Sequence, residues 1–193
     1  MMIENVSQHL QHFNQDYVCE ISNRVEIVET AESGAGTATF EIDGVAVKIK
    51  GHNNSPLLWA LSERKCADGA FLTFDNNGTR LHIVELKGHV RPANWPSVKA
   101  QFKGMFLTSL AVTKILSIAS VYSVTCYIAA QKDGMSVGTT ASPTLLKTLV
   151  GGTHTLGGRE DWETATIELP FGVVANLVKG WRDASGNVNF GQV

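Results

Sequence analysis

The sequence predicts a mixed α/β fold in one domain, residues 1–193. Apolar residues recur every three or four positions between Val6 and Ile21, as they do along one side of a helix. Runs rich in β-branched and aromatic residues, separated by turn residues, then extend from about residue 24 to residue 90. A long apolar helix pattern and one more strand pattern follow. This order of helix, strands, helix and strand differs from a regular βαβ alternation.

Local patterns predict the individual elements. Asp43-Gly44 is a strong hairpin signal, and the turn at residues 75–78 joins two further strand patterns. Asn94 is a suitable N-cap, and Pro96 suits the first turn of the long helix. The expected elements are a helix over 5–21, a strand over 24–29, two strands within 37–51, strands over 67–74 and 80–88, a helix over 95–118, a strand over 121–130 and a short helix over 144–150. The tail should add a strand, a short helix and a hairpin.

Composition and termini argue against several classes of protein. The chain has a formal net charge of -2, and its three cysteines lack CxxC spacing, which disfavours a disulfide framework and a zinc knuckle. The N-terminus lacks a basic segment followed by an apolar core, so no signal peptide is expected. The apolar run over 105–121 is short and interrupted by polar residues, which favours a buried helix over a membrane span. These features predict a cytoplasmic protein with no membrane partner.

The middle of the chain is basic although the whole chain is nearly neutral. Between residues 76 and 114 the only acid is Glu85, whereas six basic residues occur there: Arg80, Lys87, Arg91, Lys99, Lys103 and Lys114. Such a segment is compatible with a polyanion site, and a solvated basic helix face is an equal alternative.

Period-two geometry predicts a cluster on the hairpin of residues 67–88. With an Asn77-Gly78 loop, Asp68 pairs with Lys87; with a four-residue loop over 75–78, Asp68 faces Glu85. Both registers put Asp68, Glu85 and Lys87 on one face, at the end away from the turn. Two neighbouring carboxylates repel each other unless a positive charge lies between them, and Mg²⁺ is commonly held by one or two carboxylates.

The segments "ADGAFL" and "HIVELKG" resemble the core motif of the PD-(D/E)XK nuclease superfamily, which includes restriction enzymes, resolvases and recombination nucleases. In that motif an acid opens one strand and Glu-x-Lys lies on the next; Asp68, Glu85 and Lys87 match these positions. The resemblance covers about residues 5–130. It implies a restriction-endonuclease-like core in αβββαβ order, with a mixed central sheet flanked by helices. Residues 131–193 would be a loop-rich C-terminal extension.

The resemblance implies a nuclease that hydrolyses DNA phosphodiesters with Mg²⁺ or Mn²⁺. Asp68, Glu85 and the backbone carbonyl of Leu86 would bind the metal, and Lys87 would be the catalytic cation. Three basic residues would contact the phosphate backbone: Arg91, Lys99 and Lys103. Enzymes of this class often cut two strands as dimers, so a homodimer is compatible with the resemblance.

Other positions are accessory or depart from the motif. The acid that the family carries on its first helix would be Glu20 or Glu4, and Gln101 matches a helix Gln found in some branches. Ala67 stands where the motif often has Pro, and Met105 stands where those branches have Tyr.

Three alternatives stay open at this stage. Glu85 and Lys87 could be an exposed pair on an edge strand, and Asp68 could be an Asp-Gly turn residue. Asp75 is the second candidate for the first acid. The same fold could also serve as a non-catalytic module that binds nucleic acid or protein.

Overall fold

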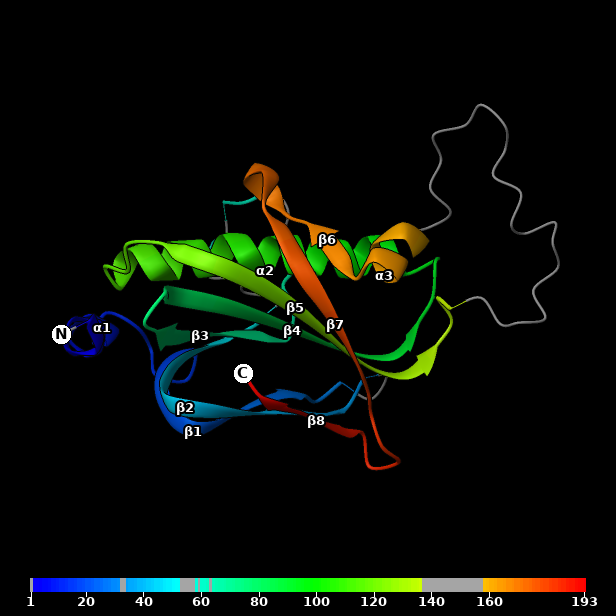
Figure 1. Ribbon diagram of the computed structural model, residues 1–193, viewed down its shortest axis with the longest axis horizontal. Coiled ribbons are helices and arrows are strands. Elements are labelled where there is room, and N and C mark those ends of the chain that lie inside the picture. The colour runs from blue at the N-terminus through cyan, green and yellow to red at the C-terminus, as the bar shows by residue number, and fades with distance from the viewer. Residues whose placement is uncertain (1, 32–33, 53–57, 59, 63, 137–157) are drawn as a thin grey trace, which may run out of the picture.

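A computed structural model describes residues 2–31, 34–52, 58, 60–62, 64–136 and 158–193, and its elements are arranged as Figure 1 shows. The helices are α1 (Met2–Leu10), α2 (Trp95–Ile115), α3 (Arg159–Thr164) and the 3-10 turn η2 (Pro170–Gly172). The strands are β1 (Val18–Glu29), β2 (Gly36–Lys50), β3 (Gly69–Asp75), β4 (Gly78–Val90), β5 (Val121–Asp133), β6 (Thr166–Glu168), β7 (Val174–Trp181) and β8 (Asn187–Gln192). The expected helix over 144–150 lies outside the described residues. Within them no helix is long and apolar enough to cross a bilayer.

One mixed sheet organises the described chain, which confirms the predicted mixed α/β class. Its strands follow the order β1-β2-β3-β4-β5-β7-β6, and β8 pairs with β2 off this path. β1 to β4 form an antiparallel meander, and β5 then runs parallel to β4 after the crossover through α2. The sheet therefore changes from antiparallel to parallel pairing at β4, the strand that carries Glu85 and Lys87.

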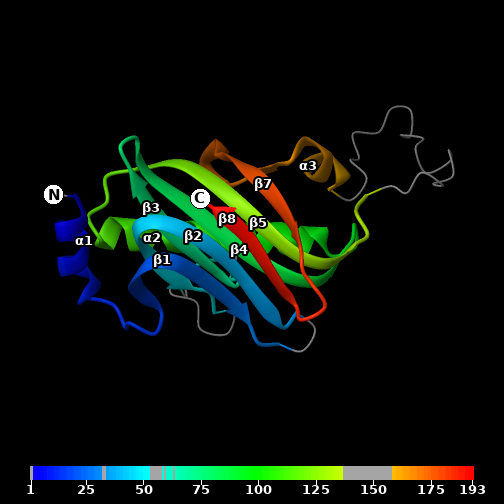
Figure 2. The same cartoon turned by 60° about the horizontal axis from the view of Figure 1, so that its bottom comes forward.

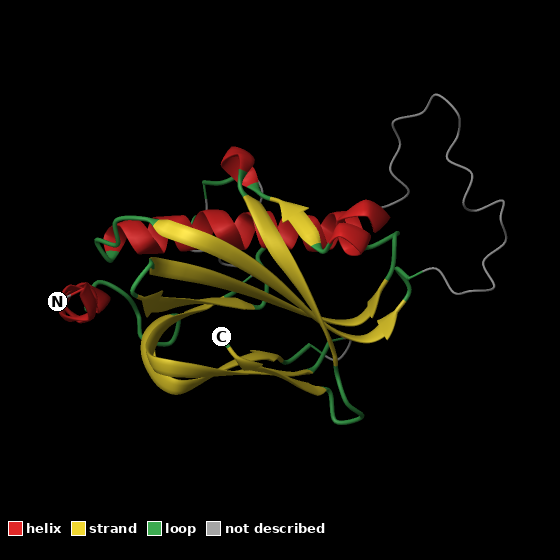
Figure 3. Ribbon diagram, in the orientation of Figure 1, coloured by secondary structure: helices red, strands yellow, loops and turns green. Residues whose placement is uncertain are grey.

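Helix α2 covers one face of this sheet, as Figure 3 shows. Alternate strand residues, such as Leu72 and Ile83, pack in one buried cluster with Phe102 and Met105 of α2. The other strand residues, such as Phe71 and Tyr127, belong to a second cluster with Phe40 of β2. Among the described residues the expected helical cover is thus present on one face; on the other face the curled β1, β2 and β8 layer covers the core (Figure 1).

The predicted hairpin at Asp43-Gly44 is wrong, because β2 continues through both residues as one strand. Gly44 has a φ of 85°, and opposite it the β1–β2 register shifts between Ser22 and Arg24. The β2 residues between Glu41 and Val45 outnumber those opposite them in β1 and form a bulge. This bulge bends the β1–β2 ribbon but does not reverse the chain direction. Beyond the bend β2 exchanges neighbours: its first half pairs with β8 and its second half with β3 (Figure 2).

The first helix is shorter than predicted, because the chain from Val18 onward is strand β1. Val18 pairs with Ile49 and is fully buried, so the apolar spacing that suggested a helix serves a sheet. The C-terminal extension also differs from a loop-rich segment: its described part, residues 158–193, contributes three strands to the sheet.

The backbone of Gly51 lies in close contact with residues 67 and 68, the segment that leads into β3. The amide of Gly51 donates to the carbonyl of Asp68 at 3.0 Å, and a Cβ at residue 51 would lie 1.7 Å from the carbonyl oxygen of Ala67. We expect Gly51→Ala to lower the free energy of unfolding by about 1–3 kcal/mol, because backbone must move to make room. Urea denaturation measures this change. A variant within about 0.5 kcal/mol of the wild type would show that this contact is not required.

Candidate active site

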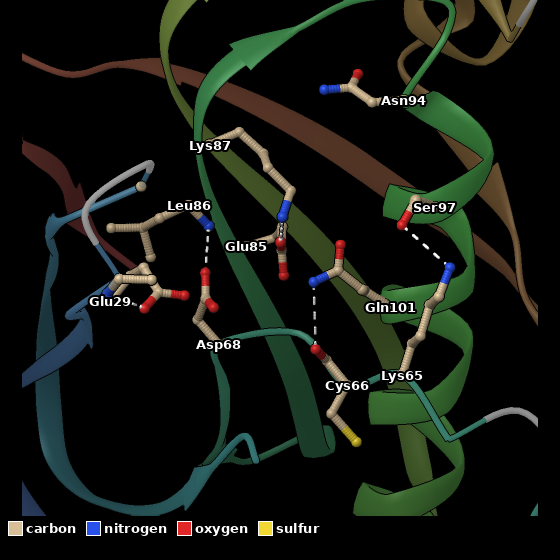
Figure 4. Close-up of polar contacts among 12 residues, drawn as sticks. Glu29, Lys65, Cys66, Asp68, Glu85, Leu86, Lys87, Asn94, Ser97 and Gln101 are labelled. Atoms are coloured by element: carbon tan, nitrogen blue, oxygen red, sulfur yellow. Dashed lines mark hydrogen bonds and ion pairs between the residues drawn. The ribbon is translucent and has the colours of Figure 1, made fainter. Parts of the chain in front are cut away.

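The candidate site lies at the N-terminal end of β3, where β4 extends beyond the part that pairs with β3. β3 and β4 pair Leu72 with Leu81 and Gly69 with Val84, so Asp68 comes opposite Glu85. This is the second of the two predicted registers. Past Val84 the β4 backbone has no partner in β3, and the Leu86 amide instead donates to Asp68 Oδ2 at 2.6 Å (Figure 4). The aspartate thus completes the sheet's hydrogen bonding and turns its carboxylate into the site.

Glu85 is fully buried on the face of β4 that packs against α2. Its Oε1 forms an ion pair with the ammonium of Lys87, whose side chain is 28% exposed. Among the described residues no group donates a hydrogen bond of ordinary geometry to Oε2. Burial raises the pKa of Glu85, whereas the Gln101 side chain beside this carboxylate acts to lower it; a proton or a cation at the buried oxygen would stabilise the group further.

Both acids resist ionisation. Burial raises the pKa of Asp68 to about 9, and repulsion from Glu85 adds to the effect. Burial also raises the pKa of Glu85 to about 7, although the Lys87 ammonium acts in the opposite direction. Such shifts mark a place where negative charge is crowded and a positive ligand would be favoured.

A third acid, Glu29 at the end of β1, joins the cluster and escaped the sequence interpretation. Its carboxylate shares a hydrogen bond with Asp68. Burial alone would raise the pKa of Glu29, but this bond and the backbone amides of Ala31 and Thr30 outweigh it and lower the pKa. The opposite shifts indicate that Asp68 carries the proton and donates it to an ionised Glu29. Local spacing could not reveal this contact, because it depends on the bend of the β1–β2 ribbon.

The C-terminal third supplies a buried cation, Arg182, which follows β7. Its Nη1 donates to the carbonyls of Gly34 and Ala35, at 2.6 and 3.0 Å. Burial lowers the pKa of Arg182, whereas the charges of Asp68 and Glu29 act to raise it. Arg182 therefore ties the β1–β2 connection to the sheet and places positive charge behind the two acids.

Gln101 holds the segment that leads into Asp68. Its side-chain Nε2 donates to the carbonyl of Cys66 at 3.4 Å, and the backbone carbonyl of Gln101 accepts from the Ala67 amide at 3.1 Å. Figure 4 shows the amide of Gln101 projecting from α2 beside Glu85. The predicted accessory residue is thus next to both acids.

Other predicted residues lie apart from the cluster. Glu20 is on β1, not on a helix, and accepts a hydrogen bond from Ser7 at 2.8 Å; the side chain of Glu4 is outside the described part. Lys99 pairs with Asp161 at 2.9 Å. Lys103 on α2 is half-buried, and Arg91 is exposed just beyond β4.

Asp75, the second candidate for the first acid, lies in the hairpin turn. It pairs with Arg80 at 2.6 Å and accepts from the amides of Asn77 and Gly78. Its role is therefore in the turn, at the opposite end of β3 from the site.

The donors of the site fit a hard divalent cation. The amide and carbonyl of one strand residue point the same way, so the Leu86 carbonyl faces the same gap as its amide, where Gly34 approaches it. Across the described residues no three His, Cys, Asp or Glu side chains are arranged to hold a metal ion. Two carboxylates and a carbonyl, completed by water and substrate, suit Mg²⁺ or Mn²⁺ and not a closed zinc site.

Comparisons with known proteins identify no relative of this chain. No family model, curated protein or solved structure matches the chain.

The raised pKa of Asp68 predicts that Asp68→Asn stabilises the metal-free protein at high pH. Because the pKa of Asp68 is higher in the folded state, the group's contribution to stability is present below about pH 4 and is lost as the pH rises toward 9. Asn can accept from the Leu86 amide and donate to Glu29, as the protonated acid does, but it cannot ionise.

In EDTA we expect Asp68→Asn to match the wild type near pH 4 and to exceed it by at least about 1 kcal/mol near pH 8.5. Urea denaturation across this range measures the difference. Asp43→Asn, at an exposed position of β2, is the matched control and should follow the wild type. Lower stability of Asp68→Asn at every pH would mean that Asp68 is ionised in the folded protein.

Proposed function

We propose that this protein is a metal-dependent nuclease that hydrolyses phosphodiester bonds of DNA. The observation that carries the proposal is the convergence of Asp68, Glu85 and Lys87: the fully buried Glu85 carboxylate pairs with Lys87 and repels Asp68. The meander β2-β3-β4, the crossover α2 and the parallel strand β5 also support a restriction-endonuclease-like core. In the described chain Cys19, Cys66 and Cys126 form no disulfide, which agrees with a cytoplasmic location.

The side chains of the site have separate tasks in this proposal. Asp68, Glu85 and the Leu86 carbonyl would hold Mg²⁺ or Mn²⁺. The bound cation would supply Lewis-acid activation of water and stabilise the leaving oxygen. Lys87 is the most exposed of the three side chains and can leave Glu85 for a phosphate oxygen, where it would stabilise developing negative charge or orient the attacking water.

The surrounding residues keep these groups in place. Gln101 donates a hydrogen bond to the segment before Asp68. Glu29 accepts the hydrogen bond of the protonated Asp68, which would lose its proton on binding a cation. Arg91 and Lys103, which lie apart from the cluster, would contact the phosphate backbone of a bound substrate without reading sequence. Lys99 is committed to Asp161 and contributes less to this contact.

Nuclease activity should depend on Lys87. With purified protein, plasmid DNA and Mg²⁺ or Mn²⁺, we expect Lys87→Ala to slow cleavage by about 100-fold or more, because the cation near the reacting phosphate is lost. Lys132→Ala removes an exposed lysine of β5 and should cleave at the wild-type rate. Gel electrophoresis of time points measures both rates. Cleavage that survives Lys87→Ala would assign the activity to a contaminant or to another site.

Metal binding should stabilise the fold through Glu85. A cation at about ten times its Kd adds about 1.4 kcal/mol, equivalent to roughly 3–6 °C in Tm for a chain of this size. We expect Mg²⁺ or Mn²⁺ to raise the Tm of the wild type but not of Glu85→Gln, whose amide cannot supply the charge. Differential scanning fluorimetry with EDTA as the reference measures this. Equal shifts in both proteins would place the cation elsewhere, and no shift in either would favour a binding module without catalysis.

A further inference from the structure

A groove lies on the side of Asp68 that faces the bent β1–β2 ribbon. It has a volume of about 280 Å³, close to the lower end of ligand-sized pockets. Its lining includes Ile27 and Val28 of β1 and also Asp68. Because Asp68 also belongs to the candidate active site, anything bound in the groove lies beside that site.

The polar lining of the groove consists of two lysines, a tyrosine and Cys19, together with the acids Asp16 and Asp68. Lys48 and Lys50 lie two residues apart on β2 and so point to the same side of the strand. Neither ammonium forms an ion pair with a carboxylate of the described chain, whereas Lys50 lies 5.9 Å from the centre of the Tyr17 ring. The His52 ring meets the edge of Tyr17, with 6.1 Å between their centroids. The groove thus combines unpaired positive charge with a half-buried aromatic ring.

This combination suits an unpaired nucleotide. Proteins that bind single strands place phosphates on basic side chains and stack bases on aromatic rings. In a duplex the faces of the bases are covered by their neighbours, so only an unpaired base can stack on Tyr17.

We propose that the groove binds a single-stranded part of the nucleic-acid substrate, with a base on Tyr17 and the adjoining phosphates on Lys48 and Lys50. The strand would then pass Asp68 and present its phosphodiester to Glu85 and Lys87. This step rests on the proposed nuclease function, and it narrows the substrate to nucleic acid with an unpaired segment.

The test is binding of a labelled single strand of about 12 nucleotides and of the matching duplex, by fluorescence anisotropy in EDTA. We expect the wild type to bind the single strand about tenfold more tightly than the duplex. Lys48→Gln with Lys50→Gln should weaken single-strand binding about tenfold and reduce the slope of log K against log salt by about 1.4, the value for two phosphates. Tyr17→Ala should weaken it at least fivefold, whereas Tyr17→Phe keeps the ring and should retain affinity.

Arg24→Gln with Lys132→Gln is the matched control, because it removes the same charge at exposed positions away from the groove. Equal losses in the control, unchanged affinity in the groove variants or a preference for duplex would overturn the proposal. Because binding is measured in EDTA, it tests the groove proposal independently of the nuclease proposal. Single-strand binding that needs the groove but is never followed by cleavage would reject the nuclease alone. Cleavage unaffected by the groove variants would reject the groove alone.

Discussion

The site depends on one hydrogen bond, from the amide of Leu86 to the carboxylate of Asp68. β3 begins at Gly69, so it offers no backbone acceptor to the amide of Leu86 further along β4. Without the Asp68 carboxylate this buried amide would lack an acceptor. The side chain that supplies the acceptor is thereby held opposite Glu85, since the same register continues from the paired part of the hairpin. A structural requirement of the sheet and the geometry of the candidate site are therefore met by the same atom pair.

The fold collects more negative charge around this bond than stability alone would favour. Asp68, Glu85 and Glu29 lie together, and burial raises the pKa of the first two. Lys87 pairs with Glu85, and Arg182 lies behind Asp68 and Glu29, so each acid has a cation near it. Carboxylates kept close together in this way are typical of sites that bind a cation or transfer protons. The structure therefore supports a function for the cluster.

The bend in the β1–β2 ribbon links the two halves of the proposed substrate path. The bulge at Gly44 turns the first half of β2 away from β3 and toward β8. As a result, Glu29 reaches Asp68 from one end of the ribbon, while Lys48 and Lys50 line the groove at the other. One local irregularity of the backbone thus shapes both the acid cluster and the groove next to it.

The common face of the three predicted site residues could be derived from the sequence, because it depends only on the geometry of one hairpin. Asp68, Glu85 and Lys87 belong to one hairpin, and the two-residue period of a strand predicts their common face without knowledge of the rest of the chain. Helix α2 was equally predictable, because its long apolar pattern needs no distant partner to be recognised. The spacing from Val6 to Ile21, however, predicted a helix throughout, and pairing with β2 made the chain from Val18 onward a strand. Tertiary structure also decided the places of Glu29 and Arg182. Arg182 bonds to a backbone 148 positions away, and such contacts depend on how strands pair across the whole sheet, which no local pattern specifies.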